Sequence, residues 1–266
     1  MDDTKTSSVQ RCRACGGTAL PIWKGSLLDL SVQYSECPRC GYVETENPYW
    51  LDRAYSAPIN ASDTGIMSRN LSNTGITIAA LVLLGRLQGR VVDCAGGMGI
   101  LVRLLRDVGV DAFWSDPYCE NSLARGFEYS TGTADLVTAF EAFEHFTEPV
   151  KELDRLLQIS PNILLSTALI PNPTPPAGEW WYYGPEHGQH VGFFRVDTLQ
   201  KLAMDRGKNL VTDDCSYHLI SDRPIRPSSW KILIRANKLL LFIARRQLKS
   251  RTWSDHLSVS RTRHGS

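Results

Sequence analysis

The stretch Val91-Val92-Asp93-Cys94-Ala95-Gly96-Gly97-Met98-Gly99 decides the fold of this chain. Two apolar residues and an acid close a predicted strand. The glycines that follow let the backbone turn tightly and approach a ligand without a Cβ in the way. Apolar spacing over residues 100–105 predicts an amphipathic helix directly after the turn. The next predicted strand ends in Asp116, a carboxylate suited to binding two ribose hydroxyls, so the unit predicts a nucleoside-binding enzyme.

The charge of this turn narrows the choice of ligand. Asp116 lies 17 residues beyond Gly99, a spacing that suits a dinucleotide fold or a methyltransferase. Asp93, just before the turn, would repel a pyrophosphate but not the cationic, phosphate-free S-adenosylmethionine. A tight strand-to-helix turn without a ligand is the alternative interpretation.

At this turn the chain resembles the class I S-adenosylmethionine-dependent methyltransferases, although their pattern has a glycine at the position of Ala95. The resemblance implies a Rossmann-like α/β fold, and it implies that the cofactor is bound by Asp93, Ala95, Gly96, Gly97, Gly99 and Asp116.

A second segment, residues 134–146, resembles the D-x-V-x-x-x-x-x-x-E-H segment of the same family. In relatives this strand ends beside the methyl donor, so Phe140 is expected to contact the cofactor. His145 either takes a direct part in the reaction or braces the turn. The resemblance covers roughly residues 76–220.

Four cysteines predict a metal site near the N-terminus. Cys12-x-x-Cys15 and Cys37-x-x-Cys40 are two knuckles of the kind that supply a closed tetrahedral zinc site, which we interpret as structural. A disulfide or redox role is the alternative. Seven cysteines in a chain that begins with a polar stretch indicate a reducing compartment, so we expect a cytoplasmic protein. The longest strongly apolar run, residues 76–84, is too short to cross a bilayer, which takes about 20 residues.

These features predict a fold of four parts. They are a zinc ribbon over 1–46, a helical cap or linker over 47–75, an α/β class I methyltransferase sheet with helices on both faces over 76–221, and a basic amphipathic segment over 222–266. In methyltransferases of this type the segment before the first strand commonly caps the cofactor. Tyr55 and Arg69 therefore either contact the methionine part of the cofactor or fix the ribbon to the sheet.

The segment 171–190 predicts the substrate site. Four prolines within residues 171–176 exclude a helix and favour a stiff excursion over the carboxyl edge of the sheet, where open α/β folds bind ligands. Four consecutive aromatic residues, 180–183, offer faces on which a sugar or another ring stacks, unless they pack the loop onto the sheet. We predict His187 as the base that accepts the hydroxyl proton, with Glu186 as its partner and His190 as the substitute. Positioning of the reactants without a base is the alternative.

This loop and the helix predicted from residue 196 resemble the Y-x-E-H and F-F-S/T-x-x-S-L segments of bacterial sugar methyltransferases. Some of these, the sugar C-methyltransferases, also begin with a four-cysteine zinc module. Here one additional residue separates Tyr183 from Glu186-His187, and their large C-terminal domain is absent from this sequence. We therefore expect methylation of an oxygen, with a sugar hydroxyl or glycan precursor as the acceptor.

The C-terminal segment carries the opposite charge from the rest of the chain. From Arg223 onward there are 11 Lys or Arg and one acid, Asp255, which leaves 18 basic and 27 acidic residues in the remainder. Residues 230–246 predict one basic amphipathic helix that docks on the acidic body or in an oligomer, lies on the inner face of a membrane, or binds nucleic acid. An RNA methyltransferase and an inactive binding module are the alternative functions. The acidic body and the lack of an N/D-P-P-Y/F tetrad make nucleic acid the weakest partner.

Overall fold

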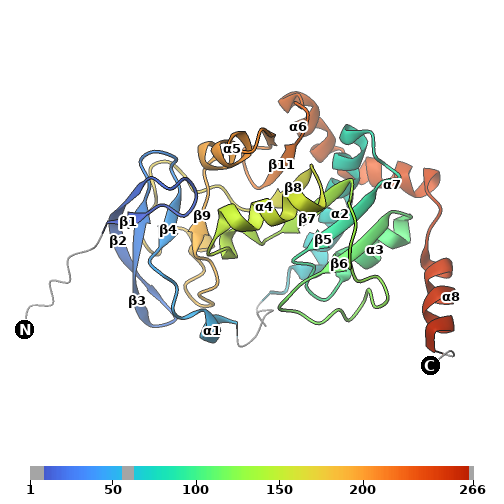
Figure 1. Cartoon of the computed structure of the whole chain (residues 1–266), viewed down its shortest axis with the longest axis horizontal. Coiled ribbons are helices and arrows are strands. Elements are labelled where there is room, and N and C mark those ends of the chain that lie inside the picture. The colour runs from blue at the N-terminus through green and yellow to red at the C-terminus, as the bar shows by residue number, and fades with distance from the viewer. Residues whose placement is uncertain (1–8, 56–62, 264–266) are drawn as a thin grey trace, which may run out of the picture.

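The computed structural model describes residues 9–55 and 63–263, which form two sheets (Figure 1). The smaller sheet has five antiparallel strands in the order β1-β2-β3-β4-β9, and the larger has six in the order β10-β11-β8-β7-β5-β6. The strands are β1 (Gln10–Arg11), β2 (Thr18–Leu27), β3 (Leu30–Glu36), β4 (Val43–Thr45), β5 (Arg90–Cys94), β6 (Asp111–Ser115), β7 (Leu136–Phe140), β8 (Ile163–Ser166), β9 (Gly192–Phe193), β10 (Asn209–Thr212) and β11 (Tyr217–Ser221).

The helices connect and cover these strands. They are α1 (Leu51–Ala54), α2 (Ile66–Leu84), α3 (Ile100–Val108), α4 (Pro149–Ile159), α5 (Val196–Met204), α6 (Pro227–Arg235), α7 (Asn237–Gln247) and α8 (Thr252–Arg263), with the short 3-10 turns η1 (Phe143–His145) and η2 (Trp181–Tyr183). Among the described residues, no helix is both long enough and apolar enough to cross a membrane.

The large sheet places a ligand site at the ends of two central strands. β6, β5, β7 and β8 run parallel, whereas β11 and β10 are antiparallel to their neighbours. The chain passes from β5 to β6 on one side and then returns to β7 on the other. This reversal makes the carboxyl ends of β5 and β7 the switch point of the sheet, where open α/β folds bind ligands.

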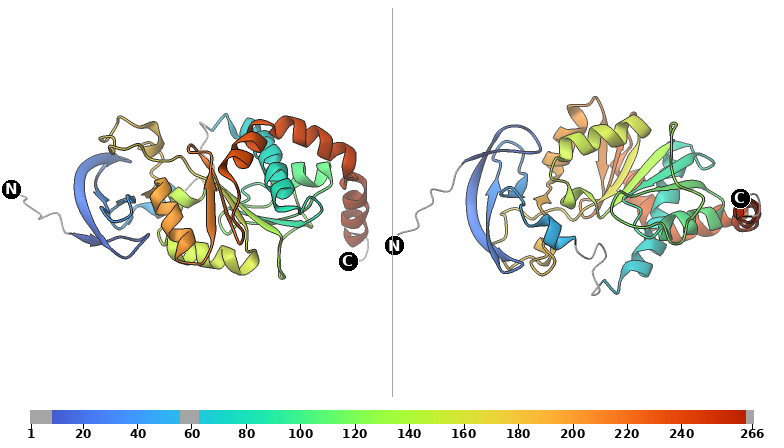
Figure 2. Two further views of the ribbon diagram at one scale, coloured as in Figure 1. Left: turned by 90° about the horizontal axis from the view of Figure 1, so that it is seen from above. Right: turned by 60° about the horizontal axis from the view of Figure 1, so that its bottom comes forward.

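Helices cover both faces of the large sheet, as predicted. Leu153 of α4 and Leu199 of α5 are fully buried in one apolar cluster with the sheet. Leu81 of α2 and Leu105 of α3 are fully buried in a second cluster, to which Trp230 of α6 belongs. Figure 2 shows α4 and α5 on one side of the sheet and α2, α3, α6 and α7 on the other. The α/β class predicted from the sequence is confirmed.

The N-terminal ribbon is joined to the second half of the chain. β4 pairs with β9, with Val43 opposite Phe193, although the two strands lie about 150 residues apart in the sequence. Tyr182 and Tyr183 of the loop before β9 share an apolar cluster with the ribbon. The boundary predicted between residues 75 and 76 falls inside α2, which runs without a break from the cap segment into the core.

The C-terminal segment differs from the single helix predicted over 230–246. It forms α6 and α7, which are separated at Ala236, and both pack against α2. The turn between them lies close to α2, because the Asn237 carbonyl would be only 3.1 Å from a Cβ at Gly75. The Asn237 side chain also donates a hydrogen bond to the Ile234 carbonyl at 2.6 Å. The contact with α2 therefore fixes the break.

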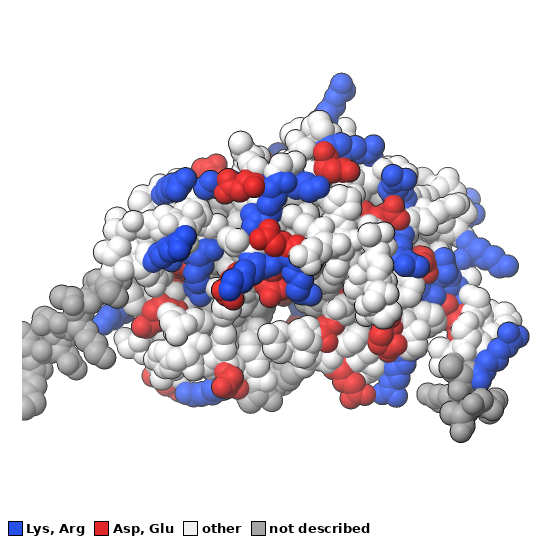
Figure 3. Space-filling view, in the orientation of Figure 1, with Lys and Arg blue, Asp and Glu red and all other residues white. Residues whose placement is uncertain are grey.

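The outer surface of this segment is basic. Figure 3 shows Lys and Arg side chains over α6, α7 and α8, at the upper and right-hand edge of the molecule. α7 also exposes large apolar side chains, with Leu239 60% and Phe242 51% exposed. The Arg246 guanidinium lies over the Phe242 ring at 4.3 Å from its centroid. The inner face of α7 thus docks on the protein, while its outer face presents cations and apolar groups to the surroundings.

Candidate active site

The glycine turn after β5 is held against β6 by its backbone. Ala95 and Gly96 both donate from their N–H groups to the Ser115 carbonyl, at 2.9 and 3.3 Å. A Cβ at Gly96 would lie 2.6 Å from the Trp114 ring, so only glycine fits there. Ala95 adopts φ +71°, a left-handed conformation that an L-residue with a Cβ rarely takes. The turn is therefore tight enough to bring its backbone up to a ligand.

The two predicted acids lie on either side of this turn. The Asp116 carboxylate accepts hydrogen bonds from the N–H groups of Gly97 at 2.9 Å, Tyr118 at 2.8 Å and Cys119 at 3.0 Å. Asp93 is only 3% exposed and accepts one bond from the Thr138 hydroxyl at 2.7 Å. Burial, with a smaller contribution from the charge of Asp116, raises the pKa of Asp93 to about 7. Asp93 is thus a desolvated carboxyl group that a cation would stabilise in its charged form.

A cavity of about 980 Å³ lies at the carboxyl ends of β5 and β7 and joins the turn to the loop. Most of the predicted cofactor and loop residues line it, namely Asp93, Ala95, Gly96, Gly97, Asp116, Tyr55, Arg69, Phe140, His145, His187 and His190. Gly99 does not line the cavity; it adopts φ +86° and precedes α3. Glu186 is exposed and does not line the cavity. Burial lowers the pKa of His187, and the charge of Glu186 partly opposes this effect.

Three histidines that line this cavity lie close together. The ring centroid of His190 lies 4.7 Å from that of His187 and 4.9 Å from that of His145. Burial lowers the pKa of each, to about 3 for His145, so these imidazoles are neutral at physiological pH. Nδ1 of His187 accepts a hydrogen bond from the Gln189 N–H at 3.1 Å. A neutral His187 in this arrangement carries its proton on Nε2.

Glu144 and two tyrosines lie beside these histidines, through tertiary contacts that the sequence did not indicate. Glu144 is fully buried and its Oε1 accepts a hydrogen bond from the Tyr182 hydroxyl at 2.7 Å. Burial, followed by the charge of Glu141, raises the pKa of Glu144 to about 8. The Tyr55 hydroxyl lies 2.9 Å from Nδ1 of His145. The Glu-His pair at the end of a predicted strand was a signal for Glu144, whereas nothing local in the sequence connects it with Tyr55 or Tyr182.

The aromatic residues of the loop divide between two roles. Tyr182 and Tyr183 are buried and pack against the ribbon or the loop itself, which agrees with the packing interpretation. Trp181 is 77% exposed and lines the cavity. Tyr118, which also lines the cavity, is 71% exposed and stacks on Tyr55. Trp181 and Tyr118 thus supply flat apolar surfaces at the cavity rim.

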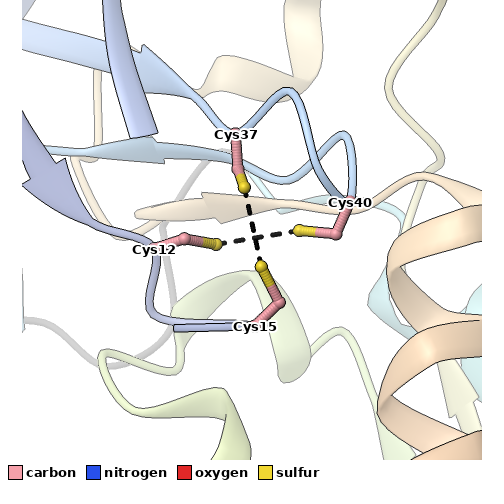
Figure 4. A group of neighbouring side chains, drawn as sticks. All are labelled: Cys12, Cys15, Cys37 and Cys40. Atoms are coloured by element: carbon pink, nitrogen blue, oxygen red, sulfur yellow. Dashed lines mark hydrogen bonds between the residues drawn. The ribbon is translucent and has the colours of Figure 1, made fainter. Parts of the chain in front are cut away.

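The four N-terminal cysteines point toward a common centre (Figure 4). Their sulfur atoms all lie within 4.8 Å of one another, with 3.7 Å from Cys12 to Cys40 and 3.5 Å from Cys15 to Cys37. Zn–S bonds of about 2.3 Å in a tetrahedron place sulfurs about 3.8 Å apart. The cluster therefore fits a closed tetrahedral metal site.

The chain is similar in sequence to known methyltransferases. A family model described as a methyltransferase domain matches residues 67–213. Magnesium protoporphyrin IX methyltransferase from Synechocystis PCC 6803 is 16% identical, with a TM-score of 0.41 over 64% of this chain and 90% of that one. The 1,6-didemethyltoxoflavin-N1-methyltransferase of Burkholderia thailandensis is 12% identical, with a TM-score of 0.46 over 76% and 97% of the two chains. No curated protein sequence matches.

Proposed function

This chain belongs to the S-adenosylmethionine-dependent methyltransferases, and on that premise we propose that it methylates an oxygen of a small-molecule or glycan acceptor, with a sugar hydroxyl as the preferred group. One observation carries the proposal. A single cavity is lined both by a glycine turn with Asp93 and Asp116 and by a group of neutral histidines. Such a cavity can hold a cationic methyl donor and a hydroxyl acceptor side by side.

Asp93 and Asp116 fit the cofactor. Among the described residues, Thr138 alone donates a hydrogen bond to the buried Asp93 carboxylate, which can therefore also accept hydrogen bonds from the ammonium group of a methionine moiety. Asp116 accepts three backbone N–H groups, which fix its carboxylate where ribose hydroxyls would donate to it. When bound, the cofactor supplies a methyl group on a positively charged sulfur, which accepts the bonding electron pair when the methyl group leaves.

The histidines of the cavity support proton removal from the acceptor. As the new C–O bond forms, the hydroxyl must lose its proton, and a neutral imidazole can accept it. His187 is the proposed acceptor of that proton. The hydrogen bond from the Gln189 N–H must open before Nδ1 of His187 is free to take the proton. Trp181 and Tyr118 at the rim support an acceptor that contains a ring, because sugars and aromatic rings stack on such faces.

We also propose that the N-terminal cluster holds one structural zinc ion. The sulfur spacing supports four thiolate ligands with no open position. The ribbon strands β1 to β4 form one sheet with β9, and Tyr182 and Tyr183 of the cavity loop pack against the ribbon, so a metal there would stabilise the loop without taking part in the reaction.

Two measurements test the proposed reaction. Calorimetry should detect binding of S-adenosylmethionine that weakens in Asp116→Ala, because a charge-assisted contact is worth about 1.5 to 3 kcal/mol. Incubation of the cofactor with a panel of sugars and hydroxylated ring compounds should give a product that is heavier by one methylene group and methylated on oxygen. Absence of cofactor binding, or a methyl group found only on carbon or nitrogen, would contradict the proposal.

A further inference from the structure

Glu144, His145 and His190 form a compact group beside the cavity, here named the Glu-His-His cluster. One ligand atom of each residue lies within 4.8 Å of the others, and Nε2 of His145 is 4.0 Å from Oε1 of Glu144. Glu144 and His145 come from the turn η1 after β7, and His190 comes from the loop before β9. Both histidines line the cavity, so the cluster opens on the space where the acceptor would bind.

Among the described residues, the hydrogen bonds of the two histidines use Nδ1 and leave Nε2 without a hydrogen bond in each. Nδ1 of His190 lies 2.6 Å from the Tyr182 carbonyl, which can only accept, so this nitrogen carries the proton and Nε2 keeps its lone pair. Nδ1 of His145 can donate to the Tyr55 hydroxyl in the same way. Histidines that bind metals typically donate their other ring N–H to a carbonyl or a similar acceptor, which fixes the ring and its tautomer.

The carboxylate of the cluster also has unused capacity. Oε1 of Glu144 accepts a hydrogen bond from Tyr182, whereas Oε2 is buried without a hydrogen-bond partner among the described residues. The Thr167 hydroxyl lies close enough to lower the pKa of the carboxyl but forms no hydrogen bond with it in the normal range of geometry. A buried oxygen without a partner is uncommon in folded proteins. Oε1, which lies 4.0 Å from Nε2 of His145, keeps a further acceptor position, so a cation between the two residues would offset the burial of this carboxylate.

We propose that Glu144, His145 and His190 bind one divalent transition-metal ion, with a coordination position open to the acceptor side of the cavity. Two imidazoles and one carboxylate form the ligand set of many catalytic zinc sites and of the 2-His-1-carboxylate sites of iron. Imidazole ligands favour zinc, iron or a similar ion over magnesium. Ligand atoms on tetrahedral zinc lie about 3.4 Å apart, so the 4.0 Å pair must approach by about 0.6 Å and no pair by more than about 1.4 Å.

This proposal rests on the proposed function and assigns the metal a place in it. A hydroxyl that occupies the open position becomes more acidic and loses its proton more readily. The proton passes to His187 or to water, the oxygen forms a bond to the methyl carbon, and the C–S bond breaks with its electron pair on sulfur. The products are a methylated acceptor, S-adenosylhomocysteine and a proton, and no group is oxidised or reduced.

Metal content and cobalt binding of the full chain test the proposal without reference to activity. Protein purified with zinc should contain two ions per chain, and His190→Ala or Glu144→Gln should contain one. His256→Ala is the matched control, because His256 is exposed and lies outside the cluster. Tyr55→Phe keeps all three ligands but removes the acceptor for His145, so it should weaken cluster metal affinity by about 10- to 100-fold. This variant serves where loss of Glu144 prevents folding.

Spectroscopy can distinguish an ion bound at the cysteine ribbon from one bound at the Glu-His-His cluster. Co²⁺ added to protein whose ribbon is filled with zinc should give visible absorption without the near-ultraviolet band of cobalt–thiolate bonds. One ion per chain in wild type and no further Co²⁺ binding would overturn the proposal, as would loss of the second ion in His187→Ala but not in His190→Ala. Metal binding without methyl transfer would contradict the proposed function alone, whereas unchanged methyl transfer by protein shown to have an empty cluster would contradict the metal proposal alone.

Discussion

Asp93→Asn should separate the effect of the buried Asp93 charge on folding stability from its effect on cofactor affinity. Asp93 is almost completely buried, and its pKa rises from the ordinary 3.8 to about 7 because burial penalises the charged form. One pKa unit corresponds to about 1.4 kcal/mol, so a charged Asp93 costs the folded protein at most about 4 kcal/mol in the absence of a cation. Asparagine keeps an oxygen that can accept the hydrogen bond from Thr138 but removes the charge.

The sign of the pH dependence follows from the raised pKa. The folded protein binds the Asp93 proton more tightly than the unfolded chain does, so this group favours folding below pH 4 and loses that contribution as the pH rises toward 7. Above pH 7 the cost is constant. The variant should therefore unfold at a higher denaturant concentration than wild type at pH 8, and the difference should shrink toward pH 6.

Cofactor affinity should change in the opposite direction. Loss of a charge-assisted bond to the ammonium group removes about 1.5 to 3 kcal/mol, so S-adenosylmethionine should bind about 10- to 150-fold more weakly at pH 8. Denaturant titrations at several pH values and calorimetry measure the two effects. Asp205→Asn, at an exposed carboxylate that pairs with Lys201, is the control and should change neither. A variant with wild-type cofactor affinity, or one that is less stable at pH 8, would refute this account of Asp93.

The remaining predictions concern the loop, the ribbon and the tail. His187→Ala and His190→Ala should each lower the single-turnover rate of methyl transfer by about 10²- to 10⁴-fold with little change in cofactor affinity, and wild-type rates in both would exclude the loop histidines. Cys37→Ser should lose the ribbon zinc and unfold at a lower temperature, whereas unchanged metal content would rule that site out. We expect the outer face of α7 to bind anionic vesicles in sedimentation assays and Phe242→Ser/Arg246→Glu to bind less; a wild-type protein that stays in solution would contradict this.

The parts of the site that the sequence predicted are those in which chemistry is local. The glycine turn, Asp93 and Asp116 belong to one strand-turn-helix-strand unit, so their spacing alone places them together. The cysteine knuckles are local in the same way, and only their mutual approach depends on the pairing of β2 with β3. Ala95 adopts a left-handed backbone conformation that is unfavourable for residues with a Cβ. Its N–H donates to the Ser115 carbonyl of β6, and this contact holds the turn in place.

The Glu-His-His cluster and its supporting tyrosines were beyond such reasoning, because they depend on tertiary contacts. Tyr55 and His145 lie 90 residues apart in the sequence, and Tyr182 and Glu144 lie 38 apart. They meet because β9 pairs with the ribbon strand β4 and so carries His190 back to the end of β7. The sequence does not show which distant side chain a single tyrosine, glutamate or histidine will contact.

The C-terminal segment shows that a count of charges does not reveal the role of a single charged residue. A count of residues makes Asp255 a single acid in a strongly basic segment, with no indication of a role. In the structure it is 4% exposed, and its Oδ2 lies 2.7 Å from both the Arg103 and the Arg106 side chains of α3. Burial opposes ionisation of this carboxyl, but the two guanidinium groups outweigh it and lower the pKa. The one acid of the tail therefore joins α8 to α3, where Arg251 of the tail also pairs with Asp111.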